Sequence, residues 1–217
     1  DTRAIYLPET IGVHPRRSDN VALYKLMVRL EAGLHEFGTF DFDLERAAAR
    51  CGRPLPDDEG KGADLDRFCR TFPTPALARD LFFVFEQGRI QRRLARRWPG
   101  LHRRVLPQIR SAFDAGRSSI VGRLFSRLVL GTPPAGDPAA GEADRWVERF
   151  DRELSADPSV ETSAVMVHAV YPEAARSATE KGGEGRYRPF CFPFDRRLRP
   201  DLFFFSDRAC ERSAAAL

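Results

Sequence analysis

The sequence predicts an all-α fold, an irregular antiparallel helical domain followed by an extended C-terminal tail rich in proline and aromatic residues. Apolar residues recur at steps of three and four over several long segments, which is the spacing of one helical face. Residues that start or stop helices, such as Pro75 and Gly38, stand at the ends of these segments. Prolines interrupt the phenylalanine-rich residues 187–205, and they oppose both a regular helix and a central strand there.

The composition is that of a folded protein. A chain of 217 residues and 24.5 kDa has room for one ample core, and its 42% hydrophobic and 30% charged residues are typical of a globular chain rather than a disordered one. No apolar run approaches the roughly 20 residues that cross a bilayer, and no signal-peptide pattern opens the chain, so we expect a cytoplasmic protein. Because the chain begins at Asp1 without Met and ends in Leu217 after three alanines, we expect a piece of a longer protein.

The first helix follows an N-terminal arm. Pro8 and Pro15 favour an extended arm over residues 1–17. The helix is predicted to begin near residues 18–20, which include good N-cap types, and to end at Gly38. Its apolar face consists of Val21, Leu23, Tyr24, Met27, Leu30, Leu34 and Phe37.

A short second helix is predicted over residues 42–50. Asp41 or Asp43 caps its start and Gly52 stops it. Residues 54–64, rich in Asp, Gly and Pro, are then expected to form a loop with a disordered tip.

A long helix is predicted from Pro75 to Trp98, because Pro is favoured at the first helical position and Pro99-Gly100 ends the pattern. Further helices are predicted over residues 101–113 and 117–130, and together these elements form an antiparallel layer. Residues 1–130 are therefore the predicted main domain.

The rest of the chain divides into three segments. Residues 131–141, reading GTPPAGDPAAG, are a predicted flexible linker. Residues 142–181 are predicted to add a helix over 142–154 and another that Pro158 opens and Pro172 ends or kinks, both packing on the main domain. Residues 182–217 are the predicted extended aromatic tail.

Known catalytic and metal-binding motifs are missing from the sequence. There is no Walker A loop, no dinucleotide fingerprint and no H-E-x-x-H, and the four cysteines Cys51, Cys69, Cys191 and Cys210 lack a close ligand pair. We therefore expect no metal, no cofactor and no catalytic residue, with all four cysteines reduced.

Residues of catalytic type elsewhere in the chain have simpler structural interpretations. The pairs Asp41 with Asp43 and Asp64 with Asp66 stand at helix starts, where carboxylates act as caps. Similarly, His168 lies on an apolar helix and is predicted to be a core histidine.

Five arginines of the long helix are the candidate partner-binding site. No Asp or Glu occurs from residue 87 to residue 113, so the segment produces a local positive field that suits an acidic partner. Arginines on a helix also form solvated faces or structural ion pairs, and Glu86 is placed to pair with one of them. The site residues are Arg89, Arg92, Arg93, Arg96 and Arg97, with Arg16 and Arg17 as a weaker second candidate.

Short motifs along the chain resemble a known family. These are the stretch from Phe85 to Leu101, with Glu86-x-x-Arg89-Ile90 at its start and Trp98-Pro99-Gly100-Leu101 at its end, together with Asn20, Tyr24, Glu36-Phe37-Gly38-Thr39-Phe40, Tyr187-Arg188-Pro189 and Leu198-Arg199-Pro200. They are similar to the N-terminal helical region of NorD/CbbO-type von Willebrand factor A proteins, over roughly residues 1 to 205. The D-x-S-x-S loop with which an A domain binds magnesium is absent from this chain.

The resemblance implies a non-catalytic adaptor. Members of the family act with a MoxR-class AAA+ ATPase to activate or mature a target enzyme, such as nitric oxide reductase or rubisco. The helical region is then expected to engage the ATPase, and an A domain outside this chain the target. Two alternatives stay open, a nucleic-acid-binding module that uses the arginines and the aromatic tail, and an enzyme with an unrecognised site. The first alternative predicts affinity that falls steeply with salt.

Overall fold

A computed structural model describes residues 12, 15–55, 62–100, 119–131, 140–181 and 187–190. These residues form helices and no strand, which confirms the predicted all-α fold. The helices are α1 (Arg17–Glu36), the 3-10 helix η1 (Thr39–Asp41), α2 (Leu44–Cys51), α3 (Asp64–Arg70), α4 (Pro75–Arg97), α6 (Ile120–Leu128), α7 (Ala140–Ala156) and α8 (Glu161–Lys181). The predicted helix over 101–113, residues 132–139 of the predicted linker and nearly all of the tail lie outside the described ranges. The last two residues of the predicted linker, Ala140 and Gly141, belong to α7, so the prediction of a linker is wrong there.

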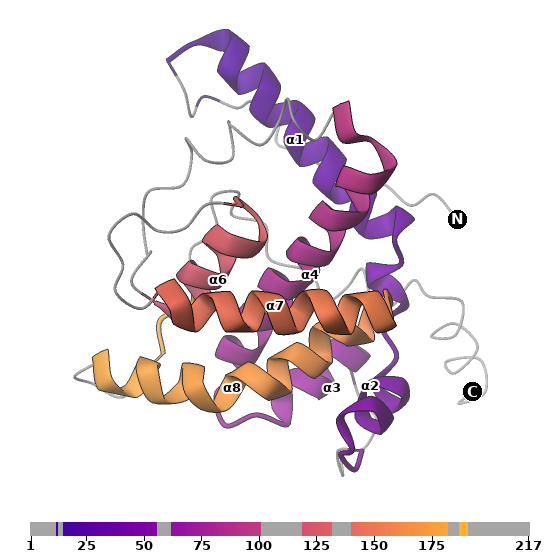
Figure 1. The fold of residues 1–217 in the computed structure, drawn as a ribbon, viewed down its shortest axis with the longest axis vertical. Coiled ribbons are helices and arrows are strands. Elements are labelled where there is room, and N and C mark those ends of the chain that lie inside the picture. Colours follow the sequence, from indigo (N-terminus) through magenta and orange to yellow (C-terminus); the bar gives the residue numbers. More distant parts are fainter. Residues whose placement is uncertain are drawn as a thin grey trace.

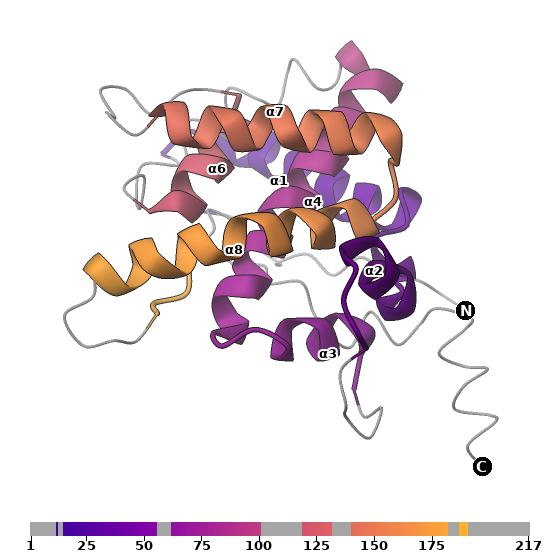
Figure 2. The same cartoon turned by 60° about the horizontal axis from the view of Figure 1, so that its bottom comes forward.

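Helix α4 runs through the middle of the molecule (Figure 1). Helices α7 and α8 form an antiparallel pair across it, and Figure 2 shows α2 and α3 at the opposite side of α8 from α7. The last turns of α4 extend beyond α7 in both views, and Figure 1 shows them beside α1, which contacts α4. None of the described helices has the length and apolar character needed to cross a membrane.

Local signals in the sequence set the helix ends. After α1, Gly38 adopts a left-handed φ of 70°, which is the predicted end of that helix. Of the two aspartates predicted to cap α2, Asp43 does so, because its Oδ1 accepts from the backbone N–H groups of Glu45 (2.9 Å) and Arg46 (3.1 Å). Similarly, the Ser119 hydroxyl accepts from the N–H of Gly122 at 3.1 Å and starts α6.

Helix α8 does not end at Pro172. It continues to Lys181, so the prediction that Pro172 ends the helix is wrong. Tyr171 and Ala174 on either side of it are buried, at 7% and 1% exposure. Burial of these flanking turns favours the continued helix against the roughly 3 kcal/mol that an interior proline costs.

A single hydrophobic core contains residues from every described α-helix. Helices α7 and α8 therefore share one core with the described helices from α1 to α6. Two glycines let helices cross closely at α4. A Cβ on Gly33 of α1 would lie 2.8 Å from Ile90 Cγ2, and one on Gly88 would lie 3.1 Å from Leu128 Cβ of α6. Gly33 is thus a packing glycine, because a larger residue there would push Ile90 and the two helices apart.

Candidate functional site

The five arginines predicted as one partner-binding site occupy different environments along α4. Residues on an α-helix turn by about 100° per position, so a run of arginines is spread around the axis. Arg89 is 1% exposed, Arg92 and Arg93 are half-buried, and Arg96 and Arg97 are exposed. The single arginine surface expected from the sequence is therefore not present, and for Arg89 the expectation of an accessible position is wrong.

Arg89 forms a buried ion pair with Glu86, one turn earlier on α4. Its Nε donates to Glu86 Oε2 at 2.8 Å, its Nη2 donates to Glu86 Oε1 at 2.5 Å, and neither side chain exceeds 1% exposure. Burial disfavours the charge of Arg89, but the adjacent Glu86 carboxylate outweighs it and raises the pKa of Arg89. The guanidinium therefore stays charged inside the core.

Other elements complete this buried cluster, which we define as Thr39, Glu86, Arg89 and Ser163. The hydroxyl of Thr39 donates to Glu86 Oε1, and that of Ser163 in α8 donates to Oε2 at 2.9 Å. Arg89 also donates to the backbone carbonyls of Phe37 (2.9 Å) and Pro158 (3.1 Å). The buried cluster therefore joins the turn after α1, the middle of α4 and the start of α8.

Arg50 of α2 holds the segment that leads into α8. Its guanidinium lies 2.8 Å from Asp157 Oδ2 and donates to Thr162 Oγ1 at 3.0 Å. Burial disfavours the Asp157 charge, but hydrogen bonds from Ser159 and the charge of Arg50 outweigh it and lower the pKa of Asp157. These contacts fix the carbonyl of Pro158, which Arg89 uses.

Arg92 links three helices. Its Nε pairs with Asp151 of α7, its Nη1 donates to the carbonyl of Leu128 at 3.4 Å, and its guanidinium lies 4.9 Å from the ring centroid of Phe150. A side chain with these contacts is a bridge within the protein rather than a free cation.

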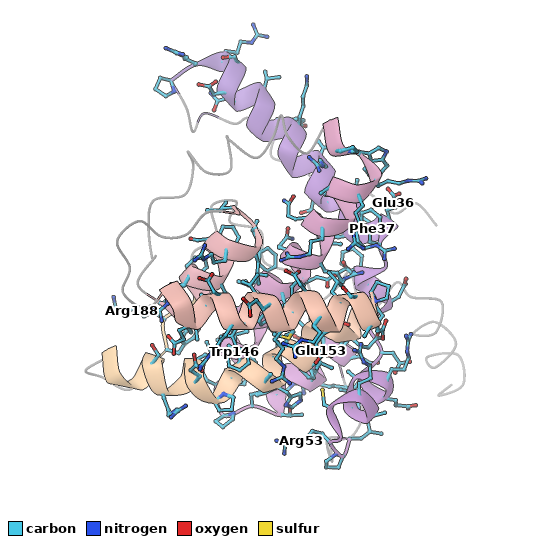
Figure 3. The ribbon with its side chains drawn as sticks, in the orientation of Figure 1. Glu36, Phe37, Arg53, Trp146, Glu153 and Arg188 are labelled. Atoms are coloured by element: carbon cyan, nitrogen blue, oxygen red, sulfur yellow. The ribbon has the colours of Figure 1, made fainter. Side chains whose placement is uncertain are left out.

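The last turn of α4 and the residue after it present accessible cationic and aromatic side chains. The basic end of α4, as we define it, consists of Arg93, Arg96, Arg97 and Trp98. Arg93 lies over the ring of Phe37 at 5.0 Å, and Trp98 is 39% exposed. Neither Arg96 nor Arg97 forms an ion pair with any residue that the structure describes. Figure 3 shows Phe37 and Glu36 beside this end of the helix.

The weaker candidate pair lies elsewhere. Arg16 and Arg17 stand at the start of α1, and both are exposed. They therefore lie at the end of α1 remote from Phe37, and they do not join the basic end of α4.

Other residues of catalytic type have structural roles. Asp43 is a cap, as described, and Asp66 pairs with Arg79 of α4. His168 is half-buried against Phe68 and Phe72, with ring centroids 5.4 and 4.7 Å apart, and burial lowers its pKa. Within the described ranges, no three His, Cys, Asp or Glu side chains gather as metal ligands.

The cysteines that the structure describes form no disulfide. Cys51 is half-buried, and burial raises the pKa of the enclosed Cys69 thiol to about 12. Cys191 and Cys210 lie outside the described residues.

The start of the predicted tail is fixed to α4. Asp80 Oδ2 accepts from the Tyr187 hydroxyl at 2.7 Å and from the backbone N–H of Phe190 at 2.6 Å. Burial and the Asp80 charge raise the pKa of Tyr187, and the ring of Phe190 lies 6.0 Å from that of Phe125 in α6. Over residues 187–190, the chain thus packs on α4 and α6.

Two features escaped the sequence interpretation. Nothing in the sequence indicated that Thr39 and Ser163 donate hydrogen bonds to Glu86. Both residues are remote from Glu86 in sequence, and only the fold brings them together. Trp98 belongs to the predicted helix-ending motif, but its place directly after the exposed Arg96 and Arg97 is also a signal for an interface, where Trp and Arg are enriched.

Comparison with known proteins gives no relative of this chain, because no protein-family model matches it and neither the curated proteins nor the solved structures contain a significant match.

Proposed function

We propose that this chain is a non-catalytic adaptor region that engages a MoxR-class AAA+ ATPase through the basic end of α4. The observation that carries the proposal is the state of Arg96 and Arg97, which are exposed and form no ion pair with any described residue. Internal roles account for Arg89 and Arg92, so the partner-binding role is now assigned to Arg93, Arg96, Arg97 and Trp98.

The chemistry of this surface suits an acidic protein face. Exposed guanidinium groups bind carboxylates by paired hydrogen bonds, and the neighbouring Trp98 supplies apolar surface that a partner can bury. Trp and Arg together are the residue types that most often dominate interface energy. The class of ATPase and the maturation of a target enzyme come from the motif resemblance, and a target is expected to bind through an A domain outside this chain.

The test is a pull-down of the MoxR-class ATPase encoded in the same genome, with and without ATP. The variant is Arg96→Glu combined with Arg97→Glu. Its matched control is Arg176→Glu combined with Arg188→Glu. Arg176 is exposed in the later half of α8, which Figure 1 shows on the opposite side of the molecule from the last turns of α4, and Figure 3 shows the exposed Arg188 on that same side. The expected result is capture by the wild type and by the control, with loss of capture in the α4 variant.

Two results would overturn this proposal. One is an absence of capture in every nucleotide state. The other is binding of single-stranded nucleic acid with an affinity that falls steeply with salt, which is the behaviour of the alternative module.

A further inference from the structure

A second surface lies at the other end of the molecule, where α2, α3 and α8 meet. They enclose a groove with a volume of about 480 Å³ that is open on one side. Figures 1 and 2 both place α2 and α3 away from the last turns of α4. This α2–α3–α8 groove is therefore separate from the basic end of α4, and a ligand bound there would be additional to the proposed contact with the ATPase.

Aromatic rings line much of the groove. Phe72 lies between His168 and Tyr171, with ring centroids 4.7 and 4.6 Å away, and Phe68 lies 5.4 Å from His168. The Tyr171 hydroxyl accepts from the backbone N–H of Thr74 at 2.7 Å, which fixes its ring. Phe72 and Tyr171 are each 7% exposed, so together they form an apolar floor of the groove that an aliphatic or aromatic side chain can contact.

The rim carries an accessible positive charge beside an apolar side chain. Arg53 and Leu55 both line the groove after the end of α2, and Leu55 is 49% exposed. Arg53 is exposed and has no carboxylate partner among the residues that the structure describes. Figure 3 shows its side chain extending beyond the helices at the lower end of the molecule. A carboxylate is the group that complements this positive charge.

The wall of the groove also contains a backbone acceptor without its regular helical donor. Pro172 has no N–H, so the carbonyl of His168, four residues earlier in α8, loses the helical hydrogen bond that residue 172 would normally supply. Both residues line the groove. An N–H group of a ligand can replace that donor.

We propose that the α2–α3–α8 groove binds a peptide segment of a protein partner in which an apolar side chain stands next to a carboxylate. The apolar side chain packs on Phe72 and Tyr171, the carboxylate pairs with Arg53, and a peptide N–H donates to the His168 carbonyl. A simple apolar acid matches the first two features but has no N–H to donate, and one cation is too few for a nucleic-acid backbone. The open side of the groove leaves room for the chain of a peptide to continue.

The experiment measures fluorescence anisotropy of labelled peptides with the full chain. One peptide library has a central Phe or Leu flanked by Glu, and the matched library has Lys in place of Glu. Decanoate serves as the non-peptide probe. The variants are Arg53→Glu and Leu55→Asp, both at exposed positions, with Arg152→Glu as the control, and all must retain the helical circular dichroism of the wild type.

The expected result is binding of the Glu library that Arg53→Glu weakens by about tenfold and Arg152→Glu leaves unchanged. The Arg96→Glu and Arg97→Glu variant should bind the peptides normally, so failure at one surface is distinguishable from failure at the other.

Three outcomes would overturn the inference. They are equal binding of the Lys library, no effect of Arg53→Glu, and no binding of the Glu library at millimolar protein. If decanoate displaces the peptide and binds at least as tightly as the peptide does, the groove is a site for small apolar acids and the proposal of a peptide is wrong.

Discussion

Arg89 and Arg96 lie two turns apart on the same helix, yet they have opposite environments. Arg89 is 1% exposed, and its guanidinium donates to the Glu86 carboxylate and to the backbone carbonyls of Phe37 and Pro158. Arg96 is exposed and forms no ion pair with a described residue. The two positions show that a run of like charges in sequence is not a surface until the fold decides which of its members are covered.

Two causes explain the difference. A carboxylate, Glu86, precedes Arg89 by one turn, whereas no acid precedes Arg96 at that distance. The start of α8 and the turn after α1 also cover the middle of α4, whereas the last turns extend beyond α7 (Figure 1). Arg89 can therefore be a core residue, because a carboxylate pairs with its charge and neighbouring segments shield it from solvent.

The largest predicted effect is at the buried cluster. Replacing Arg89 by Met leaves the Glu86 carboxylate buried without its partner, and we expect a loss of about 3–5 kcal/mol in the free energy of unfolding. Urea denaturation measures it. Combining Arg89→Met with Glu86→Gln removes the unpaired charge and should restore part of that loss. A single Arg89→Met variant that loses less than about 1 kcal/mol would contradict the assignment of this pair to the core.

An intermediate effect is expected at Arg92, which bridges α4 to α6 and α7 but is partly open to solvent. Arg92→Ala removes the ion pair with Asp151, the contact with the Phe150 ring and a hydrogen bond to a carbonyl, and should cost about 1–2 kcal/mol. The same urea titration measures the loss. An Asp151→Asn variant isolates the ion pair and should cost less, because that carboxylate is half exposed. Equal costs for the two variants would mean that the carbonyl and ring contacts contribute nothing.

The fold was largely readable from the sequence because local signals determine helices. Asp43 caps α2 and Gly52 stops it, as predicted, since capping depends only on residues within one turn. The continuation of α8 past Pro172 was not readable, because it depends on burial against helices that are remote in sequence. Local chemistry predicts where helices begin more reliably than it predicts what tertiary packing tolerates.

The candidate site was less readable for a related reason. Sequence spacing indicated that Glu86 would pair with an arginine, but not that Thr39 and Ser163 would enclose the pair. The groove beside Arg53 was not predictable from the sequence, because its lining residues come from three helices that are separated along the chain. Surfaces assembled from separated segments require the tertiary structure.

A smaller effect is expected from acid at the support of the buried cluster. The pKa of Asp157 is lowered in the folded protein, so its stabilising contribution is present above the unfolded value of about 3.9 and is lost as the pH falls through the folded value. Asp157→Asn should therefore be less stable than the wild type near neutral pH, and the difference should shrink as the pH falls from the unfolded value through the lower folded value. Urea titrations at several acidic pH values measure it. A difference that stays constant as the pH falls well below the unfolded value would show that this carboxylate contributes through geometry rather than charge.

The smallest effect is expected at the basic end of α4. Arg96→Gln combined with Arg97→Gln removes two charges from the last turn of a helix, where cations stabilise the helix dipole by about 0.3–1 kcal/mol. Because both side chains are exposed, added salt should reduce this small loss, whereas the loss in Arg89→Met should change little, since a buried pair is screened weakly. Urea titrations at low and high salt compare the two variants. A large, salt-independent loss at Arg96 and Arg97 would make them structural residues like Arg89, and the basic end of α4 would then be unsuited to bind a partner.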